Sequence, residues 1–80
     1  MVNIIFDIKF KELFSRIKDS SLKTKIIKQI EKIKINPDVG KPMMNVRKGT
    51  CELYIKPLRL SYEYIKDIVY ILDIYHKNEQ

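Results

Sequence analysis

The stretch of residues 53–76, LYIKPLRLSYEYIKDIVYILDIYH, constrains the fold of this chain more than any other part of the sequence. Tyrosine, isoleucine, valine and leucine dominate it, and these residues fit the pleated, half-buried surface of a sheet. Pro57 cannot donate to a ladder of hydrogen bonds, so a turn is expected at Lys56-Pro57, and Lys66-Asp67 predicts a second tight turn. Three strands are therefore expected, at residues 51–55, 58–64 and 68–75.

Upstream of these strands, apolar residues recur at helical spacing and predict two amphipathic helices. The helices cover residues 8–17, with Asp7 as N-cap, and residues 22–35. Their apolar stripes are Phe10, Leu13, Phe14 and Ile17, then Leu22, Ile26, Ile30 and Ile33. An apolar run at residues 2–6 predicts a first strand. The order β-α-α-β-β-β predicts an α+β fold, with a helical hairpin on one face of a small antiparallel-type sheet.

Size and charge limit the classes of function. With 80 residues, the chain is expected to form one domain over residues 1–80. Sixteen Lys and Arg against ten Asp and Glu give a net charge of +6, which suits a polyanion such as nucleic acid. The alternative is that a small lysine-rich protein is merely soluble. No apolar run approaches the length of a transmembrane helix, so no membrane partner is expected.

Cys51 is the only cysteine. One cysteine forms no internal disulfide, which predicts a reducing, cytoplasmic location. We interpret Cys51 as a small residue at the edge of a strand rather than a catalytic thiol.

Candidate site residues are mainly cations, because the sequence has no glycine-rich phosphate loop and no suggestive pair of carboxylates. Arg59 lies inside an apolar strand, where it must reach water or meet an anion. A two-residue turn at Lys66-Asp67 would place Arg59 opposite Ile74, with His76 as its diagonal neighbour on the same face, although a one-residue slip would separate them. Arginine can stabilise charge on a phosphorane, and histidine can exchange a proton near neutral pH.

A simpler interpretation makes Arg59 the salt-bridge partner of Glu63 or Asp73. Further candidates for contact with RNA or phosphate are Arg47 and Lys48 in a long loop over residues 36–49, Lys56 in a turn, and Tyr54, on which a base can stack. Solvated charge is the alternative for the loop cations.

The run ELYIKPLRLSYEYIKD, followed by ILDIYHK, resembles the RelE/ParE superfamily of toxins from toxin–antitoxin pairs. The family pattern of a turn, an arginine and then a tyrosine is matched by Pro57, Arg59 and Tyr62, and its basic pair after the last strand by His76-Lys77. INPDVGKPM resembles the family's loop after the second helix, and the resemblance covers nearly the whole chain.

This resemblance implies a ribosome-dependent mRNA endonuclease that cleaves mRNA in the A site and inhibits translation. It implies that Arg59 stabilises the scissile phosphate, that Lys77 assists the leaving group or the phosphate, and that His76 serves as general acid or base. No cofactor and no metal are implied, because attack by a 2′-hydroxyl needs none. The implied partners are the ribosome, mRNA and a cognate RelB-like antitoxin, whose acidic amphipathic helix would lie in an apolar groove. Operator DNA would be bound only through that complex.

Two departures from the family pattern leave alternatives open. Thr50 and Glu52 stand where some relatives carry two strand lysines, and Lys77 lacks the bidentate fork of an arginine. One alternative is a ParE-like inhibitor of DNA gyrase that does not cleave RNA. The other is a non-catalytic module that binds RNA or a partner, with Arg59 merely salt-bridged.

Overall fold

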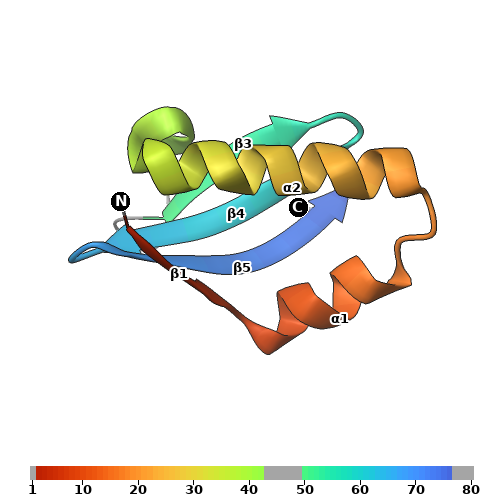
Figure 1. Ribbon diagram of the computed structural model, residues 1–80, viewed down its shortest axis with the longest axis horizontal. Coiled ribbons are helices and arrows are strands. Elements are labelled where there is room, and N and C mark those ends of the chain that lie inside the picture. Colours follow the sequence, from red (N-terminus) through yellow and green to blue (C-terminus); the bar gives the residue numbers. More distant parts are fainter. Residues whose placement is uncertain (1, 43–49, 77–80) are drawn as a thin grey trace.

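The computed structural model describes residues 2–42 and 50–76. The elements are β1 (Asn3–Phe6), α1 (Ile8–Arg16), α2 (Ser20–Ile35), a 3-10 turn η1 (Pro37–Val39), β2 (Lys41–Pro42), β3 (Thr50–Ile55), β4 (Leu58–Ile65) and β5 (Ile68–His76). The strands form one sheet in the order β1-β5-β4-β3-β2. Figure 1 shows α2 crossing the sheet, with α1 beside the end of β1. The predicted α+β order is confirmed.

The sheet differs from expectation in two respects. β1 pairs with β5 in parallel, so the sheet is mixed rather than purely antiparallel. Two helices separate β1 from the other strands in sequence, and a connection of that length allows parallel pairing. The short strand β2, within the loop expected at residues 36–49, pairs with β3. Neither helix in the described part of the chain is long and apolar enough to cross a membrane.

Local side chains set where the helices begin. Asp7 accepts a hydrogen bond from the backbone N–H of Lys9 at 3.0 Å, which confirms it as the N-cap of α1. Asp19 accepts from the N–H groups of Ser21 and Leu22 at 2.9 and 3.2 Å. Because this carboxylate satisfies the first N–H groups of α2, the helix begins at Ser20, two residues earlier than expected.

The core lies on one face of the sheet. Its α2 side consists of Ile26, Ile30 and Ile33, and its sheet side includes Leu60, Tyr62, Val69 and Ile71. α1 contributes Phe10, whose ring stacks between those of Phe6 and Phe14 at centroid distances of 5.7 and 5.6 Å. Both helices therefore pack on the same face, and alternation along β4 directs Arg59 toward the other.

The β4–β5 hairpin contains an irregularity that changes the candidate site. Lys66 and Asp67 both have positive φ, 48° and 67°, as a two-residue type I′ turn requires. Pairing is regular as far as Tyr62 with Ile71, and then Ser61 pairs with Asp73. Leu72 is thus the extra residue of a β-bulge. The bulge lets Ile71 and Ile74, which are three residues apart, both enter the core, at 0% and 5% exposure.

This bulge shifts the register by one residue. Arg59 lies opposite Tyr75, and His76 lies opposite Leu58. Paired residues share a face, and the side chain of Leu58 belongs to the core, so Arg59 and His76 lie on opposite faces of the sheet. The expectation that Arg59 would face Ile74, with His76 as its diagonal neighbour, is wrong.

Candidate functional site

Four residues on the sheet face away from α2 form what we term the Arg59 cluster: Glu52, Tyr54, Arg59 and Tyr75. Tyr54, Arg59 and Tyr75 make one row across β3, β4 and β5. Glu52 lies two positions before Tyr54 on β3, and its side chain therefore points to the same face. Three neighbouring strands thus bring together a cation, a carboxylate and two phenol rings.

The contacts within the cluster centre on the carboxylate. Arg59 Nη1 forms an ion pair with Glu52 Oε1, and the hydroxyl of Tyr75 donates to Glu52 Oε2 at 2.7 Å. The guanidinium carbon of Arg59 lies 5.8 Å from the centre of the Tyr54 ring, a cation–π distance. Both ion-pair side chains remain partly accessible, at 30% exposure for Arg59 and 18% for Glu52.

The ion-pair partner of Arg59 is therefore Glu52, and the expectation of Glu63 or Asp73 is wrong. Residue 52 reaches Arg59 diagonally, because Tyr54 is the direct cross-strand partner. Asp73 instead forms an ion pair with Lys9 Nζ of α1 at 3.1 Å. Arg59 also keeps one buried donor, Nε, with no acceptor among the described residues.

The structure brings together some of the predicted site residues. Tyr54 and Arg59 are adjacent, and Lys56 is exposed in the turn at the same end of the sheet. His76 is exposed at the end of β5, on the other face. Arg47, Lys48 and Lys77 lie outside the described residues.

Sequence reasoning missed Glu52 as the ion-pair partner of Arg59 and Tyr75 as its cross-strand neighbour on β5. A β3–β4 hairpin that turns at Lys56-Pro57 pairs Tyr54 with Arg59, so the hairpin register was a signal that could have found Glu52. No comparable local signal places Tyr75 beside Arg59, because its position opposite Arg59 depends on the bulge at Leu72.

A second polar group of residues lies on the core side and has a structural role. The hydroxyl of Tyr62 donates to the carbonyl of Pro37 at 2.6 Å and accepts from the N–H of Gly40 at 2.9 Å. Burial raises the pKa of Tyr62 to about 12. Burial also raises the pKa of the Cys51 thiol, so this thiol is protonated at neutral pH, a poor state for a nucleophile.

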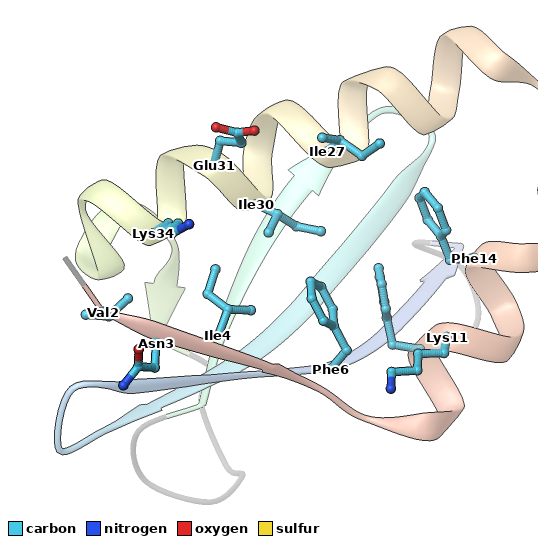
Figure 2. Close-up of a pocket in the computed structure, with 11 residues that line it drawn as sticks. Val2, Asn3, Ile4, Phe6, Lys11, Phe14, Ile27, Ile30, Glu31 and Lys34 are labelled. Carbon is cyan, nitrogen blue, oxygen red and sulfur yellow. The ribbon is translucent and has the colours of Figure 1, made fainter.

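An apolar groove of about 620 Å³ runs between β1, α1 and α2. Figure 2 shows Ile30 of α2 facing Ile4 and Phe6 of β1 across it. Its lining also includes Val2, Asn3, Phe10, Phe14 and Ile27, with Lys11, Glu31 and Lys34 as charged members. In the described part of the chain, no group of three or more His, Cys, Asp or Glu is arranged to hold a metal ion.

Comparison with known proteins identifies a family. Residues 5–80 match the family model described as the ParE toxin of the type II toxin–antitoxin system parDE. No curated protein matches the chain.

Several solved structures share the fold. A chain of the intact RelBE toxin–antitoxin complex of E. coli superposes with a TM-score of 0.82, at 14% identity over 95% of this chain and 96% of that one. The Staphylococcus aureus YoeB dimer gives 0.79, at 19% identity over 94% and 95%. A chain of the chromosomal ParDE system of Pseudomonas aeruginosa gives 0.75, at 15% identity over 95% and 96%. At these identities the likeness shows a common fold.

Proposed function

The chain belongs to the ParE toxin family, within the RelE/ParE superfamily of type II toxin–antitoxin toxins, and from this premise we propose that it is a ribosome-dependent mRNA endonuclease held inactive by an antitoxin. The observation that carries the proposal is the Arg59 cluster. It combines a phosphate-binding side chain with an aromatic ring on one accessible sheet face. Tyr54 is 51% exposed, so a base can stack on it while Arg59 meets the adjoining phosphate.

The chemistry assigned to Arg59 is electrostatic. When a 2′-hydroxyl attacks its own phosphate, negative charge accumulates on the non-bridging oxygens, and a guanidinium can donate two hydrogen bonds to them. The resemblance implies that Lys77 assists the leaving group or the phosphate, and the proposal keeps Lys77 as a second cation at the phosphate. His76 lies on the other face of β5. The proposal therefore assigns it no proton transfer in the cleavage of the phosphate that Arg59 binds.

The deciding experiment is primer extension on mRNA in programmed ribosomes. We expect wild-type protein to cut in the A-site codon and Arg59→Ala to cut at least about 100-fold more slowly, as for loss of one transition-state donor. Arg16→Ala, which removes an exposed arginine in the last turn of α1, is the matched control and should cut normally. Intact mRNA with wild-type protein, in an assay where an active relative cuts, would exclude the endonuclease.

A second candidate is inhibition of DNA gyrase without RNA cleavage. It is favoured by the ion pair with Glu52, which neutralises Arg59 at a position where some relatives carry a lysine. Gyrase supercoiling assays separate the two activities. Loss of supercoiling together with intact ribosomal mRNA would establish the second candidate in place of the first.

The apolar groove is the proposed docking site for an antitoxin. Complexes with an antitoxin are among the structures that share this fold, namely RelBE and YoeB-YefM. The groove has an apolar lining, with Lys11 and Lys34 among its residues, and the whole chain carries a net charge of +6. An amphipathic helix with an apolar face and acidic flanks is complementary to both features.

Two substitutions on α2 test this docking site. Ile27 lines the groove and is 48% exposed, so Ile27→Asp should weaken antitoxin binding at least about tenfold without unfolding the chain. Ile35 is 76% exposed and does not line the groove, so Ile35→Asp should leave the Kd unchanged. Equal effects of the two variants would place the antitoxin elsewhere.

A further inference from the structure

Glu52 stands at the point where a proton acceptor is needed in the proposed reaction. Its carboxylate touches the guanidinium of Arg59 through one oxygen and the hydroxyl of Tyr75, at 2.7 Å, through the other. In RNA the attacking 2′-oxygen and the scissile phosphate belong to the same nucleotide. A carboxylate beside the arginine that binds the phosphate is therefore also beside the hydroxyl that must lose its proton.

We propose that Glu52 is the general base of this RNA cleavage and that Tyr75 is its proton-transfer partner. The inference rests on the proposed endonuclease function. On substrate binding, the guanidinium of Arg59 passes from Glu52 to the phosphate, which exposes Oε1 to the 2′-hydroxyl. Removing the cation from the carboxylate also makes it a better proton acceptor.

Glu52 and Tyr75 together accept one proton from the substrate and return one proton to it. Glu52 takes the 2′-hydroxyl proton as the bond between the 2′-oxygen and phosphorus forms. Tyr75 gives its phenolic proton to the 5′-oxygen as the bond between phosphorus and that oxygen breaks. The proton held by Glu52 then passes along the existing hydrogen bond to Tyr75. The products are a 2′,3′-cyclic phosphate and a 5′-hydroxyl, and both side chains return to their starting states.

Other carboxylates of this sheet face are worse placed. Asp73 is held by Lys9 of α1, and Glu63 is only 6% exposed, which keeps it from a substrate. The register sets Lys41 of β2 opposite Glu52. Lys41 and Arg59 are therefore the cations, among the described residues, that the register and the ion pair place beside Glu52.

The test measures single-turnover cleavage in programmed ribosomes across a range of pH. Glu52→Gln keeps the shape of the side chain but removes its basicity, so cleavage should fall about 100-fold or more while binding to the ribosome is retained. The wild-type rate should fall at acid pH as Glu52 takes up a proton, and this acid limb should vanish in Glu52→Gln. Asp73→Asn, on the same face, is the matched control and should keep the wild-type rate and profile.

Tyr75→Phe is an independent test of the proposed proton transfer, because it leaves the Arg59–Glu52 ion pair in place. It should slow cleavage at least about tenfold and keep the acid limb. Each variant is checked for cooperative urea unfolding. If Glu52→Gln does not fold, a Tyr75→Phe protein that cuts at the wild-type rate overturns the proposed pair as a whole.

The outcomes separate this inference from the proposed function. If wild-type protein cuts and Arg59→Ala does not, the endonuclease stands, whatever the result for Glu52. A folded Glu52→Gln that cuts as fast as wild type, or faster, overturns the role of general base. In the faster case, Glu52 would merely compete with phosphate for Arg59. A Tyr75→Phe protein that cuts at the wild-type rate overturns the partner role of Tyr75.

Discussion

At the scale of single residues, the Arg59–Glu52 ion pair makes a stability prediction that is independent of any activity. Arg59→Ala removes the ion-pair partner of the Glu52 carboxylate, which is 18% exposed. A mostly buried charge that loses its ion-pair partner is costly, so we expect the free energy of unfolding to fall by about 1–2 kcal/mol. Adding Glu52→Gln should recover part of that loss, because the buried charge is then removed. Urea denaturation measures both, and a loss no larger than that of Arg16→Ala would contradict the prediction.

Tyr62 predicts how stability depends on alkaline pH. Its pKa is raised to about 12 in the folded chain, whereas an unfolded tyrosine has a pKa of about 10. Above pH 10 the unfolded state therefore loses its proton first, and stability falls as pH rises toward 12. Two pKa units correspond to about 2–3 kcal/mol.

Tyr62→Phe should remove this alkaline loss, as measured by urea unfolding at pH 8 and pH 11. At pH 8 the same variant should be about 1–3 kcal/mol less stable than wild type, because the buried groups of Pro37 and Gly40 lose their partner. Parallel alkaline curves for the two proteins would contradict the assignment to Tyr62.

At the scale of elements, the connection from α2 to β2 packs closely against the side chain of Tyr62. A Cβ at Gly40 would lie 2.6 Å from the Tyr62 hydroxyl and 2.8 Å from its ring. The φ of Gly40 is −82°, so crowding and not backbone conformation requires glycine here. Gly40→Ala should lower the free energy of unfolding by about 1–3 kcal/mol.

The neighbouring Val39→Ala, at a position 39% exposed, is the control for Gly40→Ala and should cost much less. Thermal unfolding monitored by circular dichroism compares the two. Equal melting temperatures would show that the connection moves away from Tyr62 at little cost.

At the scale of the whole molecule, an antitoxin in the groove should stabilise the chain by mass action. A partner present at 100 times its Kd contributes about 2.7 kcal/mol, which for a domain of this size raises Tm by about 10 °C or more. Titration of the toxin with its antitoxin, followed by calorimetry, checks this. Ile27→Asp should show a smaller rise at the same antitoxin concentration, whereas an identical rise would place the stabilising contact outside the groove.

The sequence by itself determined every element except the 3-10 turn and β2, together with most of their limits, because the signals involved are local. Apolar spacing identified both helices, Asp7 was identified as a cap, and Lys66-Asp67 identified a hairpin turn. Alternation along residues 58–64 also separates Arg59 from the apolar Leu58 and Leu60, since alternation along a strand needs no knowledge of its neighbours. The family pattern likewise depends on residues that are close together in sequence.

Only the tertiary structure decided which residues surround Arg59. The bulge at Leu72 arises because Ile71 and Ile74 are both buried beneath the helices, and this demand comes from the packed core. The bulge turned Tyr75 toward Arg59 and His76 away from it. Arg59 pairs with Glu52, and not with Glu63 or Asp73, for two reasons that only the tertiary structure supplies. The strand register places Glu52 beside Arg59, and Lys9 of α1 forms an ion pair with Asp73. Such choices depend on contacts between segments far apart in sequence, which no local pattern encodes.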